Sequence, residues 1–190
     1  RRQMIILLNG PPGCGKDTIA KIIKKKIGSR DYKMSKPLKD AFSGLFAVHG
    51  QLLHELLEER KDTKFWVDSK ITPREILIAL SEEFIKPRFG DDFFGHIAAV
   101  ALHQLAGKHK TISDCGFNAE VPPIADAFGY NNVKAILINR PDCEWDSRES
   151  LDYKNIGIQG TNLNNLYDLD MLDTQVTRIL RRWGLIDDGS

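Results

Sequence analysis

Cysteine is scarce in this sequence, and its few copies form no pattern typical of disulfide-rich or zinc-binding domains. The 190 residues contain three cysteines, Cys14, Cys115 and Cys143, an odd number that includes no C-x-x-C pair. This pattern argues against a disulfide framework and against a zinc site. We therefore expect a reducing, cytoplasmic environment.

An excess of one charge and a long apolar run are also missing. Lys and Arg number 27 against 26 Asp and Glu, which gives a net charge of +1. Nothing in this balance favours binding to nucleic acid or to a membrane surface. We expect no secretory leader, and we find no apolar stretch of the roughly 18 residues that a membrane helix needs. With 42% hydrophobic residues, the chain can form one domain with a sizeable core and a mobile subdomain.

A glycine-rich segment is the most informative feature present. Residues 10–18 read GPPGCGKDT and follow the apolar run at 4–8 directly. Glycines let the chain wrap closely around an anion, and the N-terminus of the next helix directs N–H groups at the same place. Lys16 adds a charge for the β- and γ-phosphates of a nucleotide. The segment therefore predicts a P-loop that binds ATP through Gly13, Cys14, Gly15, Lys16, Asp17 and Thr18.

Asp17 is a departure from the usual P-loop pattern, which has Ser or Thr after the lysine. A hydroxyl at that position normally contacts Mg²⁺. We consider two roles for Asp17: it holds Mg²⁺ through water, or it caps the helix. Thr18 can then donate to an α-phosphate oxygen.

Strands alternate with helices along the chain. We expect strands at 4–9, 31–35, 110–114, 133–139 and 156–158, and helices at 16–27, 37–46, 52–59, 72–86, 93–105, 121–128 and from 169 onward. Pro87 is expected to interrupt the fourth of these helices. Such alternation predicts a three-layer α/β fold with a parallel five-stranded sheet, whose ligand crevice lies at the carboxyl ends of the strands.

Two segments exceed what the fold needs. Residues 36–108 separate the second and third strands, whereas a crossover requires only about a dozen residues. We interpret 36–108 as an inserted helical subdomain that binds a second substrate within the single domain 1–190, and 141–155 as a long polar loop.

Several segments resemble P-loop nucleoside monophosphate kinases, and more narrowly the bacteriophage deoxynucleoside monophosphate kinases. They are 10–18, 35–41, 72–80 continuing to 89–93, 114–120, and Arg140-Pro141. The resemblance implies that 141–155, the loop after Arg140-Pro141, is a lid. Two positions depart from the pattern: Gly116 stands where the family often has arginine, and Ser81 replaces a common glycine. The resemblance implies an enzyme that transfers the γ-phosphoryl of ATP, with Mg²⁺, to a (deoxy)nucleoside monophosphate. It also implies a phage protein working in the host cytoplasm.

Arginines after the fourth strand are donor-side candidates beside Lys16. The resemblance makes Arg148 the lid arginine that acts with Lys16 on the transferred phosphoryl group, while the alternative is a surface arginine. Arg140 is placed against ATP, with an ordinary salt bridge as its alternative.

Acceptor-side candidates lie mostly in the insertion. Arg74 occupies the first turn of a capped helix, where a cation is unfavourable without a bound anion. Asp114 ends the third strand and either holds Mg²⁺ through water, the first of the two roles considered for Asp17, or contacts the acceptor, or caps the next segment. The other candidates are Lys36, Lys39 and Arg88, and the aromatic residues that could stack on the acceptor base are Phe65, Trp66, Phe89 and Phe93.

Other functions stay open at this point. A P-loop kinase for dephospho-coenzyme A or a sugar acid has the same loop. A P-loop ATPase usually has a glutamate after a strand-end aspartate, whereas here Cys115 follows Asp114. A nucleotide-binding regulator without turnover is a further alternative, and the sequence does not decide between a monomer and a homodimer.

Overall fold

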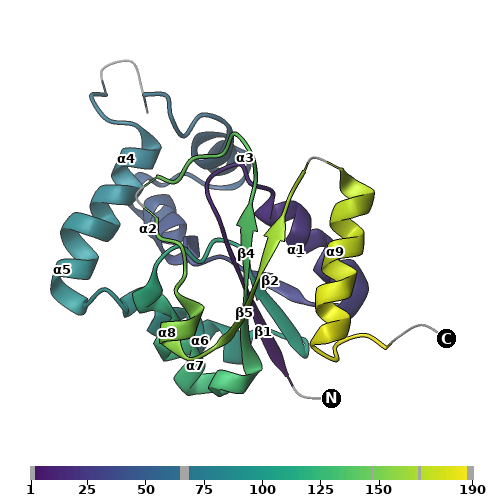
Figure 1. Cartoon of the computed structure of the whole chain (residues 1–190). Coiled ribbons are helices and arrows are strands. Elements are labelled where there is room, and N and C mark those ends of the chain that lie inside the picture. Colours follow the sequence, from purple (N-terminus) through teal and green to yellow (C-terminus); the bar gives the residue numbers. More distant parts are fainter. Residues whose placement is uncertain (1–2, 65–68, 147, 167, 188–190) are drawn as a thin grey trace. The chain divides into compact units, whose positions relative to one another are not determined.

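A parallel five-stranded sheet forms the centre of the chain, as predicted. The structure is a computed structural model that describes residues 3–64, 69–146, 148–166 and 168–187. The strands are β1 (Met4–Asn9), β2 (Arg30–Tyr32), β3 (His109–Ile112), β4 (Val133–Asn139) and β5 (Gln159–Asn164). Their order in the sheet is β2-β3-β1-β4-β5, and every neighbouring pair is parallel (Figure 1).

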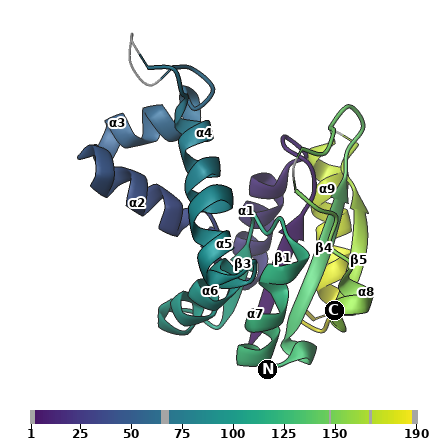
Figure 2. The ribbon, with the colours of Figure 1, turned by 90° about the vertical axis from the view of Figure 1, so that its left-hand side faces the viewer.

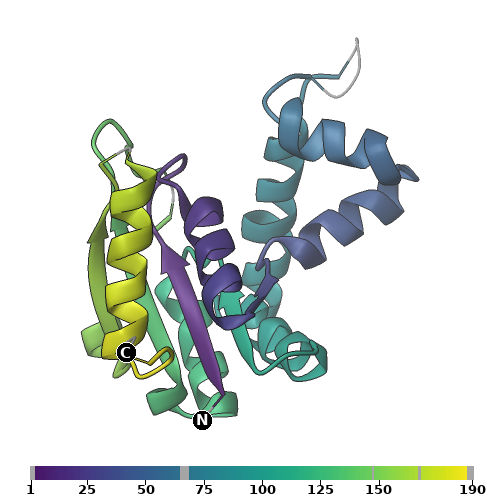
Figure 3. The same cartoon turned by 90° about the vertical axis from the view of Figure 1, so that its right-hand side faces the viewer.

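Helices cover both faces of this sheet. The helices are α1 (Lys16–Ile27), α6 (Phe93–Gln104), α7 (Val121–Phe128), α8 (Tyr153–Ile156) and α9 (Leu169–Arg182). Figures 2 and 3 show α1 and α9 on one face and α6 and α7 on the other. The predicted three-layer α/β architecture is confirmed. Among the described residues, no helix combines the length and the apolar character that crossing a membrane requires.

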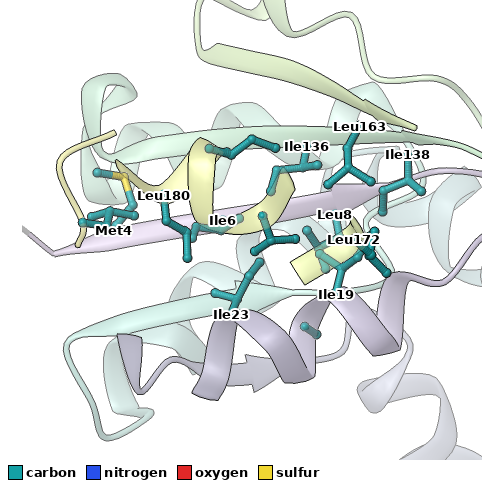
Figure 4. Close-up of a cluster of buried hydrophobic side chains, with 14 of the residues drawn as sticks. Met4, Ile6, Leu8, Ile19, Ile23, Ile136, Ile138, Leu163, Leu172 and Leu180 are labelled. Carbon is teal, nitrogen blue, oxygen red and sulfur yellow. The ribbon is translucent and has the colours of Figure 1, made fainter. Parts of the chain in front are cut away.

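The core on the α1 face is built from alternate residues of the central strand. All six residues of β1 are buried, and Ile6 and Leu8 belong to the cluster that α1, β4, β5 and α9 complete (Figure 4). Ile5 and Leu7 point to the other face because side chains alternate along a strand. This burial, worth roughly 1.5–3 kcal/mol for each large aliphatic side chain, fixes the strand end from which the glycine-rich loop departs.

A second compact unit comprises Ser35–Phe93, while residues 1–34 and 94–190 form the first. The second unit contains α2 (Lys36–Phe46), α3 (Gly50–His54), a π-helical turn (Glu55–Glu59), α4 (Pro73–Ile78), a π-helical stretch (Ala79–Ile85) and α5 (Lys86–Phe89). Its core contains Phe42, Leu56 and Leu57. The capping box of Thr72 and Glu75 at the start of α4 is confirmed.

The predicted insertion extended to residue 108, but most of α6 belongs to the first unit. Phe94, Ala98 and Leu102 of this helix are buried. At Gly95 the backbone is so close to Glu120 that a Cβ would lie 2.3 Å from the Glu120 carbonyl oxygen. This close packing joins α6 to the segment before α7.

The predicted interruption at Pro87 is wrong, because the helix continues to Phe89. The backbone changes to π-type hydrogen bonding before the proline, and the N–H of Lys86 bonds to Ser81 O. Pro87 has no N–H for the preceding turn. Arg88 Nη1 instead donates to Glu83 O at 3.1 Å and Phe84 O at 3.0 Å, so a side chain supplies donors to the turn that precedes the proline.

The last strand was also predicted at the wrong place. Ile156 ends α8, and β5 follows at Gln159–Asn164 rather than at 156–158. Only Leu163 of β5 is buried, so the strand lacks the apolar run on which the prediction relied. The second strand, predicted at 31–35, begins and ends earlier, at Arg30–Tyr32.

Candidate phosphate-binding site

The loop between β1 and α1, purple in Figure 3, has the backbone of an anion-binding cradle. Gly13 (φ 75°) and Gly15 (φ 100°) adopt left-handed conformations that disfavour other residues. Gly15 is the N-cap of α1, and no side chain of the described residues caps this helix. Free N–H groups at the start of a twelve-residue helix fit the phosphates of a nucleotide.

Lys16 lies over the loop that precedes it. Its Nζ donates to Gly10 O and Pro11 O, both at 2.7 Å, and lies 3.6 Å from Cys14 Sγ. Burial lowers the pKa of the Lys16 ammonium, the nearby Cys14 opposes this, and the positive charge of Arg148 lowers the pKa further. The lysine is thus held at the cradle, and Arg148 is close enough for the two charges to interact.

Two side chains from neighbouring strands brace the loop. Arg140, directly after β4, donates from Nη1 to Gly13 O at 2.9 Å. Asn165, directly after β5, donates from Nδ2 to Cys14 O at 2.9 Å, while its own N–H bonds to Asn139 O at 2.8 Å. Arg140 was a sequence candidate, but Asn165 was missed because the last strand was misplaced. Its position at the carboxyl end of a parallel strand is the signal that would have found it.

Part of the predicted lid loop is bound to the segments that follow β1 and β3. We call residues 148–152 the strap. Asn9 Nδ2 donates to Glu149 O at 2.9 Å, and Leu151 N donates to Asn9 Oδ1 at 3.0 Å. Glu149 N donates to Gly116 O at 2.8 Å, and Asn118 bonds to both Glu149 and Asp152. Leu151 is buried, so the strap is part of the first unit's packing.

The strap carries Arg148. Asp146 accepts from Arg148 Nε at 2.8 Å and Nη2 at 2.6 Å. The side-chain hydrogen bonds from Arg148 lower the pKa of Asp146 to about 2. Lys16 and Arg140 therefore both bond to the glycine-rich loop, and the charge of Arg148 acts on Lys16.

Carboxylate side chains gather around Lys33, the residue that follows β2. Asp17 and Asp31 both form ion pairs with Lys33, and Asp114 Oδ1 accepts from Met34 N at 2.6 Å. Burial lowers the pKa of Lys33, but the hydrogen bond to Asp17 and the charges of Asp31 and Asp114 raise it more, so the net shift is upward. Among the described residues, no three His, Cys, Asp or Glu side chains form a metal-binding group. Asp17, Asp31 and Asp114 supply carboxylate oxygens, the type of ligand that magnesium takes in proteins.

The remaining acceptor-side candidates lie in the second unit and bond within it. Lys36 pairs with Asp40 at 2.6 Å, Lys39 pairs with Glu58, and Arg74 pairs with Asp62. Arg88 bonds to helix carbonyls and lies 4.4 Å from the centre of the Phe84 ring. Phe89 and Phe93 contact each other with ring centroids 5.2 Å apart. Phe65 and Trp66 lie outside the described residues.

Comparison with solved structures supports the fold. The chain is similar to a gluconokinase from Sinorhizobium meliloti 1021, with 9% identity, a TM-score of 0.50, and coverage of 96% of this chain and 94% of that one. A sugar kinase from Janibacter sp. HTCC2649 has 12% identity, a TM-score of 0.48 and coverage of 96% and 95%. The dephospho-CoA kinase from Campylobacter jejuni has 13% identity, a TM-score of 0.41 and coverage of 94% and 96%.

Neither a protein-family model nor a curated protein matches this chain. At identities this low, the gluconokinase similarity concerns the fold alone. Together with the loop geometry and the strand order, it shows that the chain has a P-loop kinase fold.

Proposed function

We propose that the protein is an ATP-dependent kinase that transfers the γ-phosphoryl group to a (deoxy)nucleoside monophosphate. The observation that carries this proposal is the convergence of Lys16, Arg140 and Arg148 on one glycine-rich loop. Phosphoryl transfer needs positioned positive charge more than covalent chemistry. The acceptor follows from the resemblance of the 72–93 and 114–120 segments to deoxynucleoside monophosphate kinases.

The proposed reaction gives these residues different roles. Lys16 and the loop N–H groups bind the β- and γ-phosphates, and Arg148 neutralises charge on the phosphoryl group in transit. An acceptor phosphate is already ionised, so no general base is required. Asp17 and Asp114 would hold Mg²⁺ through water, and the ion would supply positive charge against that of the phosphates. Four cations of the second unit are proposed to bind the phosphate of the acceptor, which would replace their present partners. They are Lys36, Lys39 and Arg74, now in ion pairs, and Arg88, now bonded to helix carbonyls.

A coupled assay of ADP release tests the proposal. Mg-ATP is offered with dAMP, dCMP, dGMP, dTMP, AMP, UMP, dephospho-coenzyme A or gluconate, and without acceptor. Release that depends on a nucleoside monophosphate supports the proposal. Release only with dephospho-coenzyme A or gluconate would assign another acceptor, and equal release without acceptor would indicate an ATPase.

A pair of lysine variants provides the control. Lys16→Ala is expected to lower kcat at least about 100-fold, the scale for removing a charge-stabilising donor. Lys21→Ala, an exposed position on the same helix, is expected to retain activity. Equal losses in both variants would contradict a role of Lys16 at the phosphates.

A further inference from the structure

Gly116 lies directly under the side chain of Arg148. A Cβ at this position would lie 2.9 Å from both Cγ and Cδ of Arg148. Real Cβ atoms do not come so close to carbon, so any other residue here would displace the arginine stem. Gly116 also accepts a hydrogen bond from Glu149 N at 2.8 Å, which fixes the residue next to Arg148 in the chain.

The backbone does not explain the glycine. Gly116 is absent from the glycines with positive φ, so it does not adopt the left-handed backbone that favours glycine. The space occupied by Arg148 is therefore the feature of this position that requires glycine.

The guanidinium is fixed from a second side. Asp146 accepts from Nε and Nη2, and among the described residues no acceptor for Nη1 is found. The Arg148 side chain is 25% exposed, and its positive charge lowers the pKa of Lys16. The arginine is thus held at the stem and on one edge, with one nitrogen left for a ligand.

We propose that Gly116 is a positioning residue: by lacking a side chain, it leaves the space in which Arg148 of the strap stands as a phosphate-binding cation beside Lys16, in place before the acceptor binds. This inference rests on the proposed function and deepens it. An arginine carried by a mobile lid would reach the phosphates only on closure, whereas the strap bonds to Asn9, Gly116 and Asn118 hold it already.

The first experiment measures binding without acceptor. Calorimetry with inorganic tripolyphosphate is expected to show about tenfold weaker binding to Arg148→Ala, the scale of one lost charge-assisted hydrogen bond. Unchanged affinity would mean that Arg148 joins the site only after closure and would overturn the proposal. Because turnover is not needed, this measurement decides the inference even if no acceptor in the panel is phosphorylated.

The second experiment is a double-mutant cycle. Gly116→Ala is expected to lower kcat and to weaken tripolyphosphate binding about tenfold with Arg148 present, and less than about twofold in the Arg148→Ala background. Equal effects in both backgrounds would show that Gly116 acts on the fold rather than on Arg148. The matched control is Gly44→Ala, a helical glycine with nothing within 4 Å of its Cβ position, which is expected to change neither quantity.

A further variant, Asn118→Ala, tests the proposal if Gly116→Ala folds poorly. This substitution removes the hydrogen bond that Asn118 Nδ2 donates to Glu149 and the one that Asn118 Oδ1 accepts from Asp152 N. It adds no atom near Arg148. It is expected to weaken tripolyphosphate binding severalfold with Arg148 present and to have no effect in the Arg148→Ala background. No change in either background would contradict a fixed strap.

Discussion

Asn9 Nδ2 donates to Glu149 O at 2.9 Å across a sequence separation of 140 residues. The same nitrogen donates to Cys115 O at 3.0 Å, and Asn9 Oδ1 accepts from Leu151 N at 3.0 Å. Asn9 is only 1% exposed. One buried amide at the end of β1 therefore joins the segment after β3 to the strap.

Replacing this amide is expected to be costly. Asn9→Ala leaves two carbonyls and one N–H without their partner, and we expect the free energy of unfolding to fall by about 3 kcal/mol. Urea denaturation measures the loss. Asn139→Ala, whose exposed amide makes only a 3.5 Å bond to Asn164, should cost less than about 0.5 kcal/mol. Similar losses for both variants would contradict the joining role of Asn9.

Two glycines of positive φ, Gly15 before α1 and Gly28 after it, permit a matched test of the glycine-rich loop. A Cβ at Gly15 would lie 2.5 Å from Asn165 Nδ2, whereas nothing lies within 4 Å of one at Gly28. Gly28→Ala should lower stability by about 1 kcal/mol through backbone strain and leave nucleotide affinity unchanged. Gly15→Ala should also weaken Mg-ATP binding more than about tenfold, since Asn165 must release Cys14 O. Equal affinities in calorimetry would show that the brace is unimportant.

The ion pair of Asp146 and Arg148 predicts a specific acid titration. The pKa of Asp146 is about 2 in the folded chain and 3.8 ordinarily. Because the folded value is depressed, the pair contributes stability above about pH 4 and loses it as the pH falls toward 2. Asp146 is partly exposed, so this contribution stays under about 1 kcal/mol.

Carbon NMR of the Asp146 carboxyl group measures this titration. We expect a midpoint near 2 in the wild-type protein and a return to about 3.8 in Arg148→Ala. A wild-type midpoint already near 3.8 would show that the pair does not persist in solution.

Lys33 competes with magnesium for Asp17 if Asp17 holds the hydrated ion. Lys33→Met removes the ammonium paired with Asp17 and should lower the Mg²⁺ concentration that gives half-maximal activity by up to about fivefold, the scale of an exposed ion pair. Lys26→Met removes the pair with Asp173 and should leave that concentration unchanged. The same Mg²⁺ dependence in both variants would contradict a role of Asp17 in holding Mg²⁺.

The features that sequence alone predicted have strong local signals. β1 and β4 are apolar runs, and α1 lies between a glycine-rich loop and Gly28, whose left-handed conformation ends the helix. Each of these elements is specified by residues close together in the chain. The phosphate cradle was predictable for the same reason, because one continuous segment builds it.

The features that sequence did not predict depend on distant partners. β5 is a strand although only Leu163 is buried, because an edge strand needs little apolar surface. The helix passes Pro87 because Arg88 supplies donors to the preceding turn. The anchoring of the strap depends on contacts of Asn9 with two remote segments, which no local pattern contains.

The two outer strands of the sheet also bear on aggregation. β2 has only three residues, and Arg30 and Asp31 are exposed and charged. β5 is longer, but its side chains are mostly polar, and the Tyr153 ring packs onto Gly160, where a Cβ would lie 2.4 Å from it. Short, charged or covered edge strands disfavour the addition of a strand from another molecule. The central apolar strands are therefore flanked on both sides by strands that disfavour growth of the sheet into a fibril.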